Sequence, residues 1–274
     1  MTTLAGELRK LPAFVRRDFL VAWSYRLPFI TDWIGLAFQA FVFYFIGLMV
    51  DPSKLPTFGG QQTTYLEFVA VGIAISAFMT LALGRVSAGI QQEQLAGTLE
   101  SLLMTPTSPA TVQLGAVFYD LLYVPLRTAV FLVVIALAFG LDFYASGVVP
   151  ALVVLVVFIP FVWGLGIASA GATLTFRRGS GAVGLGVTVL VLFSGAYYPL
   201  DLLPSWIATL AEFNPITVAV DGMREPLLGG TGWDGVGKAV AVLLPLAAVS
   251  LVVGAVAFRS ALRRERRRGT LGLY

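Results

Sequence analysis

The stretch with the most recognisable chemical spacing is GWDGVGKA, Gly232 to Ala239, which nearly matches the pattern G-x-x-x-x-G-K-[ST] of a phosphate-binding loop. In such loops the lysine contacts the phosphates and the final hydroxyl contacts Mg²⁺. Ala239 lacks that hydroxyl, and the residues before Gly232 do not predict a strand. The sequence therefore predicts no nucleotide site in this chain.

Other residue types that support catalysis are absent or isolated. The 274 residues include no histidine and no cysteine, which removes the commonest general base, the commonest metal ligand and every thiolate site. Asp120 and Arg127 lie on one face of an apolar segment, where charges are costly and usually paired. We interpret them as an intramembrane charge pair, with a substrate or gating contact as the alternative. We expect no enzyme, no metal site and no cofactor bound by this chain.

A third stretch, EQLAGTLESLLMTPTSP, begins at Glu93 and combines carboxylates with a leucine stripe. The stripe consists of Leu95, Leu99, Leu102 and Leu103, which share one face of a helix. Glu93 and Glu100 fall off that face, and Pro106 and Pro109 stop the helix. The pattern predicts a short amphipathic helix over 93–106. This helix is either a docking surface for another protein or a plain connection between two apolar segments.

The elements that position these residues must lie in a membrane. Hydrophobic residues make up 58% of the chain and charged residues only 12%, and the mean hydropathy is +0.87. Soluble domains carry about 25% charged residues. We therefore expect an all-α integral membrane protein, built as one membrane domain over residues 1–274.

Six stretches meet the length of about 20 mostly apolar residues that a membrane-spanning helix needs. They are residues 29–50, 65–88, 112–141, 148–176, 181–198 and 236–258. Most Lys and Arg residues fall into alternate gaps and into both ends of the chain. This asymmetry predicts a multi-pass protein of the cell membrane with both termini in the cytoplasm.

The basic ends also indicate membrane lipids as partners. The tail, 259–274, is rich in arginine, and residues 4–27 predict a helix in the cytoplasmic interface. In that helix Phe19 and Trp23 lie apart from the basic Arg16 and Arg17. Neither end has the aromatic interleaving or the motif of a nucleic-acid-binding protein, so we expect no nucleic-acid partner.

The segment 199–230 predicts an external hairpin of two short helices that dips back into the outer leaflet. The helical patterns cover Pro204–Phe213 and Pro215–Leu227, and each is too short to span a membrane. Backbone ends at such a depth are tolerated where they pack in protein or line a cavity. The residues that mark this hairpin are Pro199, Pro204, Asn214, Pro215, Asp221 and Arg224.

Two of these stretches together resemble the type-2 permease of ABC transporters, the class that includes bacterial drug-resistance and polysaccharide exporters. The first is EQLAGTLESLLMTPTSP, and the second is FSGAYYPLDLLPSWIATLAEFNPITVAVDGMRE, Phe193 to Glu225. The order of features also matches over almost the whole chain: interfacial helix, two spans, cytoplasmic helix, three spans, external hairpin, last span and basic tail. The short external loops differ from the class that has a large periplasmic domain.

The resemblance implies that helix 93–106 is a coupling helix, which fits a groove on a separate ATP-binding subunit. It implies two such ATPase subunits, with ATP and Mg²⁺ bound there, and a second permease subunit in a homodimer or heterodimer. The coupling residues it designates are Glu93, Gly97, Thr98, Leu99, Glu100, Leu103, Thr105 and Pro106. The interfacial helix, with Arg16, Arg17, Phe19 and Trp23, would join that contact.

The resemblance further implies export of an amphipathic drug, lipid or glycan-lipid from the cytoplasm or the inner leaflet. The second and fifth spans would line the path at the dimer interface. Candidate contacts, chosen from position and side chain, are Phe68, Phe78, Met79, Phe193 and Tyr197. The alternatives are a stand-alone secondary carrier, which needs an ion-coupling site near the midplane, and a scaffold or sensor without transport.

Overall fold

The computed structural model describes residues 12, 16–17, 19–20, 24, 26–95, 109–176 and 179–268. Within these ranges all regular structure is helical, apart from one isolated bridge between Phe58 and Gln61. The prediction of an all-helical membrane protein is confirmed at this level. Of the expected interfacial helix, Arg16, Arg17 and Phe19 are helical and exposed, and Trp23 lies outside the described residues.

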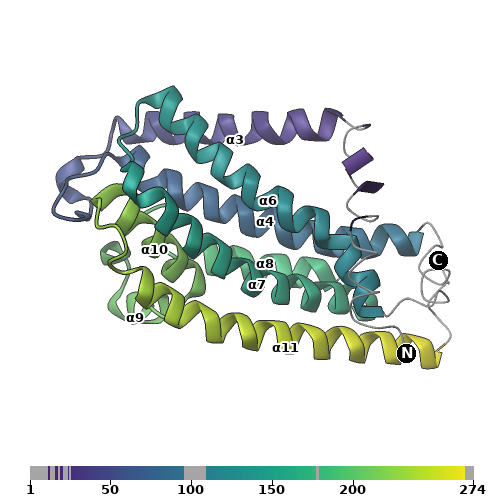
Figure 1. Ribbon diagram of the computed structural model, residues 1–274. Coiled ribbons are helices and arrows are strands. Elements are labelled where there is room, and N and C mark those ends of the chain that lie inside the picture. Colours follow the sequence, from purple (N-terminus) through teal and green to yellow (C-terminus); the bar gives the residue numbers. More distant parts are fainter. Residues whose placement is uncertain are drawn as a thin grey trace.

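Six helices follow the order of the six predicted spans. They are α3 (Arg26–Gly47), α4 (Tyr65–Leu95), α6 (Pro109–Phe139), α7 (Ala145–Phe176), α8 (Gly179–Leu192) and α11 (Val236–Arg268). Two short helices, α9 (Ser205–Ala211) and α10 (Pro215–Gly229), lie between α8 and α11, and 3₁₀ turns cover Pro52–Lys54 and Leu200–Leu202. The long helices run side by side, so the connections gather at two opposite ends of the bundle (Figure 1).

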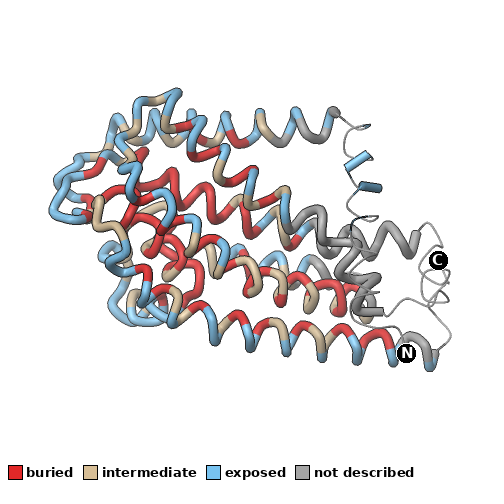
Figure 2. Tube along the Cα trace, in the orientation of Figure 1, coloured by how far each residue is buried: buried red, intermediate tan, exposed pale blue. Residues whose placement is uncertain are grey.

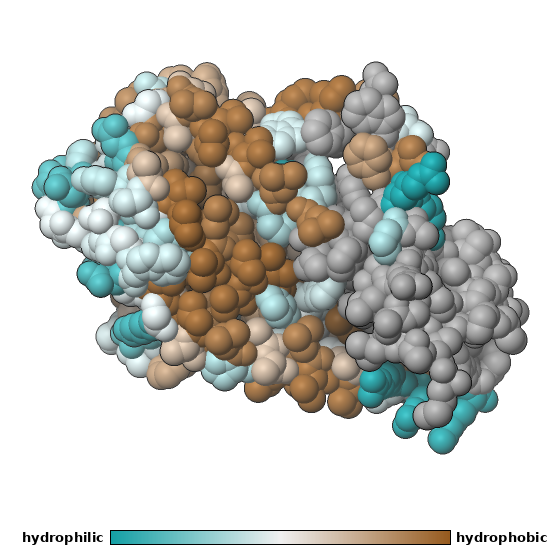
Figure 3. Space-filling view, viewed as in Figure 1, coloured by the Kyte–Doolittle hydropathy of each residue, from teal (hydrophilic) through white to brown (hydrophobic). Residues whose placement is uncertain are grey.

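Four helices in the described part of the chain are long and apolar enough to cross a membrane. The stretches are Tyr65–Gly84, Leu122–Phe139, Ala145–Thr173 and Val236–Arg264. The helices α3 and α8 contribute the shorter apolar stretches Trp33–Gly47 and Val183–Leu192. Apolar side chains cover the middle of the face seen in Figure 3, and hydrophilic residues gather toward its two ends. The chain is a multi-pass membrane protein, and crossing by α3 and α8 stays a prediction.

The fifth predicted span, 181–198, is longer than the helix found there. Helix α8 ends at Leu192, and the turn that follows contains Gly195 with a φ of 67°, which a helix cannot continue through. At about 1.5 Å per residue α8 is about 20 Å long, less than the roughly 30 Å of a hydrocarbon core. Helix α10 begins beside its end, because Nδ2 of Asn214 donates a hydrogen bond to the carbonyl of Leu190 at 2.7 Å. Helix α10 therefore begins beside the end of α8 and extends farther toward the same end of the bundle.

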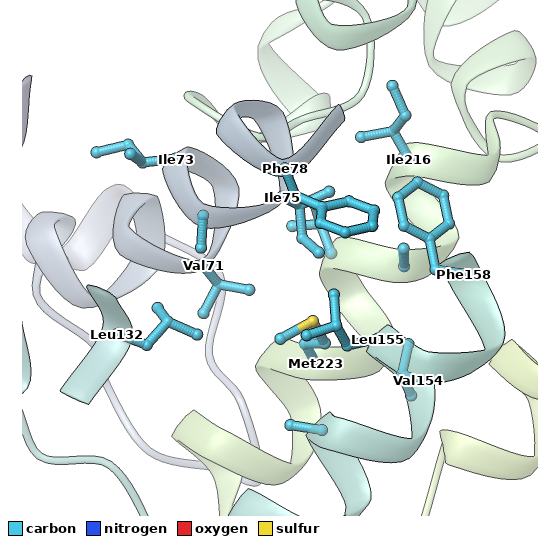
Figure 4. Close-up of a cluster of buried hydrophobic side chains, with 14 of the residues drawn as sticks. Val71, Ile73, Ile75, Phe78, Leu132, Val154, Leu155, Phe158, Ile216 and Met223 are labelled. Carbon is cyan, nitrogen blue, oxygen red and sulfur yellow. The ribbon is translucent and has the colours of Figure 1, made fainter. Parts of the chain in front are cut away.

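Helix α4 is the centre of the bundle. It packs against α3, α6, α7, α8 and α10, and 78% of its apolar stretch is buried inside the chain. Figure 2 shows α4 as a nearly continuous buried segment over residues 66–79. The close-up in Figure 4 shows Phe78 of α4 facing Phe158 of α7, with Ile216 of α10 beside them. The ring centroids of Phe78 and Phe158 are 6.0 Å apart.

Helices α7 and α11 form the most extensive contact of the described residues. Glycines bring their backbones together: a Cβ on Gly254 would lie 2.3 Å from the carbonyl oxygen of Gly164. The hydroxyl of Ser250 donates a hydrogen bond to the carbonyl of Phe161 at 2.8 Å. Close approach through small residues is the usual way in which helices pack tightly in a membrane. We interpret α7 and α11 as one rigid unit.

Candidate functional site

All but one of the predicted coupling residues lie between α4 and α6. Helix α4 continues to Leu95, so the backbone of Glu93 belongs to α4 and not to a separate helix that begins there. The residues from 85 to 95 are mostly good helix formers without proline, which explains why the helix continues. The other seven predicted coupling residues lie outside the described residues: Gly97, Thr98, Leu99, Glu100, Leu103, Thr105 and Pro106.

The two helices that flank this segment are longer than a membrane is thick. Helices α4 and α6 have 31 residues each, which corresponds to about 46 Å. The hydrocarbon core is about 30 Å thick, and a tilt of about 20° shortens the helix only slightly along the membrane normal. Each helix therefore projects beyond the core. The two helices pack against each other. The end of α4 and the start of α6 lie at the same end of the bundle as the C-terminal end of α11 (Figure 1).

A buried arginine is the main polar feature at the opposite end of the bundle. Arg224 of α10 is only 2% exposed, and its guanidinium carbon lies 3.6 Å from the ring centroid of Phe68. An arginine guanidinium stays protonated in proteins, so this buried cation needs acceptors inside the protein.

Backbone carbonyls supply most of these acceptors. Nε donates to the carbonyl of Phe68 at 3.1 Å, Nη1 to that of Gly195 at 3.1 Å, and Nη2 to that of Ala196 at 3.0 Å. Nη1 also donates to a carboxylate oxygen of Asp221 at 3.3 Å. The side chain of Asp221 is 49% exposed, so this ion pair is screened by solvent and contributes little. Arg224 thus joins α10 to α4 and to the turn after α8, mainly through neutral carbonyls.

A glycine on α4 makes this arrangement possible. A Cβ on Gly72 would lie 1.9 Å from the carbonyl oxygen of Ala196, far inside van der Waals contact. The turn after α8 therefore lies directly against the backbone of α4, and Arg224 holds it there. A second close approach involves α10 itself and the start of α7. A Cβ on Gly147 would lie 1.9 Å from the carbonyl oxygen of Pro226.

The residues that mark the predicted hairpin lie mostly at the starts of its helical elements. Asn214 caps α10 by accepting a hydrogen bond from the N–H of Ile216 at 3.0 Å, and Pro215 is the first residue of that helix. Pro204 precedes α9 as its cap residue and is not its first helical residue. Pro199 precedes the 3₁₀ turn. Two separate short helices are found here, as expected, and α10 packs against α4, α7 and α11.

An aromatic cluster lies beside the same turn. The hydroxyl of Tyr65 donates to the carbonyl of Tyr197 at 2.9 Å, and the rings of Phe43 and Tyr197 stack at 5.3 Å between centroids. Tyr197 is thereby connected to α3 and α4. The predicted path residues are not brought to one surface: Phe68, Phe78 and Met79 are buried in the core, whereas Phe193 and Tyr197 are partly exposed. The burial of the first three follows from the central position of α4, and their role in a path stays a prediction.

Glu67 is a residue that the sequence reasoning missed. Its carboxylate accepts hydrogen bonds from the N–H of Thr64 at 2.6 Å and from the N–H of Asp142 at 3.2 Å. The hydroxyl of Thr64 accepts a bond from the N–H of Glu67 at 3.3 Å. This is a capping box, and its signature of Thr followed three residues later by Glu was visible in the sequence. Glu67 fixes the start of α4 to the connection between α6 and α7.

Replacing Glu67 by glutamine should lower the free energy of unfolding by about 1–2 kcal/mol. Glutamine has one carbonyl oxygen, so one of the two backbone N–H groups loses its acceptor. Thermal unfolding of the purified protein measures the change. The control is Glu212→Gln, because Glu212 is exposed at the end of α9. Equal unfolding temperatures of the two variants would contradict the capping role.

The predicted charge pair is described only in part. Arg127 of α6 is 4% exposed, and its guanidinium carbon lies 5.9 Å from the ring centroid of Trp33 on α3. An aromatic face is thus one neighbour of this cation. The backbone of Asp120 is helical, but its side chain lies outside the described residues. The pairing of Asp120 with Arg127 stays a prediction.

The stretch GWDGVGKA forms the connection from α10 to α11 and the first turn of α11. The element before it is a helix, whereas a phosphate-binding loop follows a strand. Gly232 and Gly235 have φ values of 64° and 82°, which form a tight turn at this connection.

The family model described as ABC-2 type transporter matches residues 9–228. The linearmycin resistance permease protein LnrN of Bacillus subtilis (strain 168) is 26% identical, over 73% of this chain and 51% of its own. The daunorubicin resistance ABC transporter permease protein DrrB1 of Streptomyces coeruleorubidus is 27% identical, over 70% of this chain and 68% of its own.

A third relative is matched over a smaller part of its own length. The ABC transporter G family member 20 of Dictyostelium discoideum is 22% identical, over 76% of this chain but only 29% of its own length. This chain thus spans about three tenths of that protein and about half of LnrN.

Proposed function

Because the chain belongs to the ABC-2 type transporter permease family, we propose that it is the transmembrane subunit of an ATP-driven exporter. The observation that carries the proposal is the family match over residues 9–228, which includes the connection between α4 and α6 and nearly all of α10. Two partner ATPase subunits bind ATP and Mg²⁺, and this chain has no nucleotide site of its own. The chain crosses the membrane six times in this proposal, with α8 and α10 together making the fifth crossing, and both termini lie in the cytoplasm.

In this proposal the ATPase docks on the segment from Glu93 to Pro106. The long, mutually packed helices α4 and α6 support this role, because they would carry the segment away from the lipid surface. The helix α4 then transmits the movement of the docked segment through the bundle. Its other end carries Phe68, whose carbonyl accepts a hydrogen bond from Arg224. A displacement of α4 therefore acts directly on α10 and on the turn after α8.

The hairpin formed by α9 and α10 lies in the outer leaflet in this proposal, and α10 completes the depth that α8 does not reach. A second permease subunit covers the exposed side of α8, where Leu185, Val189 and Leu192 lie on the surface. The substrate is an amphipathic molecule such as a drug, a lipid or a glycan-lipid. The names of LnrN and DrrB1, which are resistance permeases for linearmycin and daunorubicin, support this substrate class.

The docking role is tested by purifying the tagged chain from its native membranes. We expect an ATPase subunit, identified by mass spectrometry and by ATP hydrolysis, to co-purify with it. The double substitution Gly97→Arg and Glu100→Arg should reduce the co-purified ATPase more than tenfold, because it places two cations in the docking segment. The control variant, Gln61→Arg with Gln62→Arg, adds two cations at exposed positions of the α3–α4 connection and should retain the ATPase.

The outcome decides between the proposed function and its alternatives. Loss of the ATPase from the Gly97/Glu100 variant alone, with an unchanged elution volume of the permease, supports the exporter. Absence of any ATPase from all samples, together with substrate movement that follows a proton gradient, would instead indicate a secondary carrier.

A further inference from the structure

Helix α11 has two faces that remain distinct over its whole length. Its buried residues recur every three or four positions and pack toward α7. They are Val236, Ala239, Leu243, Ala247, Ser250, Gly254, Phe258, Ala261 and Leu262. Because this stripe continues without interruption past Phe258, the basic end of α11 is held in one orientation relative to the bundle.

The opposite face changes its chemistry along the helix. In the apolar part the exposed residues include Val249, Val252, Val253 and Val256. Beyond Phe258 the exposed residues include Arg259, Arg263, Arg264 and Arg267, which we call the arginine face. At about 100° per residue these eight positions lie within about 140° of arc. The arginine face is therefore the direct continuation of a surface that points away from the bundle, into the acyl chains of a membrane.

The length of the helix sets the depth of these arginines. From Val236 to Phe258 the helix rises about 33 Å, close to the roughly 30 Å of a hydrocarbon core. Arg259 therefore leaves the core at the level of the headgroups, and Arg263 and Arg267 follow one and two turns later. Side chains on a helix lean toward its N-terminus, so these arginines lean back toward the membrane.

We propose that the arginine face binds the phosphate groups of anionic phospholipids in the leaflet at the C-terminal end of α11. A guanidinium is suited to this ligand because its planar fork donates two parallel hydrogen bonds to a phosphate. The same surface is less suited to the partner ATPase, because it continues the exposed valine side of α11, and α11 packs mainly against α7 and α10 rather than against α4 and α6. This inference goes beyond the proposed function, since it concerns binding of a membrane lipid.

The test uses the full-length protein, purified in detergent with its partners and titrated with phosphatidylglycerol or phosphatidylcholine. Native mass spectrometry measures the bound lipid. We expect phosphatidylglycerol to be preferred, and we expect the double substitution Arg259→Gln with Arg263→Gln to weaken its binding by about fivefold for each arginine. Arg259→Lys with Arg263→Lys keeps both charges and should retain most of the binding.

The matched control removes the same charge elsewhere. Lys54→Gln with Lys238→Gln removes two exposed cations at the other end of the bundle, one of them on α11 itself, and should leave the preference unchanged. Equal phosphatidylglycerol binding by both glutamine variants would overturn the proposal. Loss of the co-purifying ATPase from the Arg259/Arg263 variant, with unchanged lipid binding, would also overturn it and would assign the arginine face to the ATPase. Neither result affects the test on Gly97 and Glu100.

Discussion

Replacing Arg224 by methionine is expected to lower the free energy of unfolding by about 3–5 kcal/mol. Methionine fills much of the volume but leaves the carbonyls of Phe68, Gly195 and Ala196 without the donor that binds them. A hydrogen bond to a charged group contributes about 1.5–3 kcal/mol, so the loss of three such bonds outweighs the removal of a buried charge. Thermal unfolding of the purified protein measures the effect.

Two further variants separate the carbonyl contacts from the ion pair. Asp221→Asn removes the carboxylate but leaves the carbonyl contacts, and it should cost less than about 1 kcal/mol because Asp221 is half exposed. Arg224→Lys keeps the charge but cannot reach three carbonyls with one ammonium group, so its stability should be intermediate. A similar unfolding temperature for Arg224→Met and Asp221→Asn would show that the ion pair, and not the carbonyl contacts, holds α10.

Replacing Gly72 by alanine is expected to destabilise the protein by about 1–3 kcal/mol, the usual cost of overpacking. The added Cβ would meet the carbonyl oxygen of Ala196, a backbone atom that cannot rotate away. The same change at Gly84, also on α4, meets no heavy atom within 4 Å. Because alanine favours a helix over glycine by up to about 1 kcal/mol, Gly84→Ala should be neutral or stabilising. The two substitutions are thus expected to have opposite signs.

The effects of Gly72→Ala and Arg224→Met should not add. Both substitutions act on the carbonyl of Ala196. Gly72→Ala displaces this carbonyl, and Arg224→Met removes the guanidinium that donates a hydrogen bond to it. The combined loss should therefore be smaller than the sum by about 0.5–3 kcal/mol. A double-mutant cycle on unfolding free energies measures this coupling. Strict additivity would indicate that the turn after α8 and Arg224 are fixed independently.

The order of the helices could be predicted from the sequence because hydropathy and breaking residues are local properties. The starts and ends of α7 and α10 lie within a few residues of the predicted ones. The end of α8 was predicted six residues too late, since a run of apolar residues does not reveal the left-handed conformation of Gly195. The continuation of α4 to Leu95 was also missed, because the helix formers after Gly84 fit either one long helix or two separate ones.

The residues of the hairpin were recognised, but their roles were not. The sequence identifies Asp221 and Arg224 only as residues that mark the hairpin. The acceptors that dominate are backbone carbonyls, and the carbonyl of Phe68 belongs to a residue 156 positions away in the chain. Every residue has a carbonyl, so no residue type indicates which carbonyls a buried arginine will meet. The need for glycine at position 72 is hidden in the same way.

The sequence by itself predicted a helical membrane protein, because composition and helix length are local properties, and two of its stretches carried the resemblance to the ABC type-2 permeases that the family match confirms. Only the tertiary structure decided that α4 is the buried centre, that Arg224 joins α10 to α4 and to the turn after α8, and that the arginines of α11 lie on the same exposed side as its valines. The physical reason is that burial and hydrogen-bond partners are properties of packed pairs. When two segments that pack together are far apart in the chain, the local sequence of neither segment indicates the other as its partner.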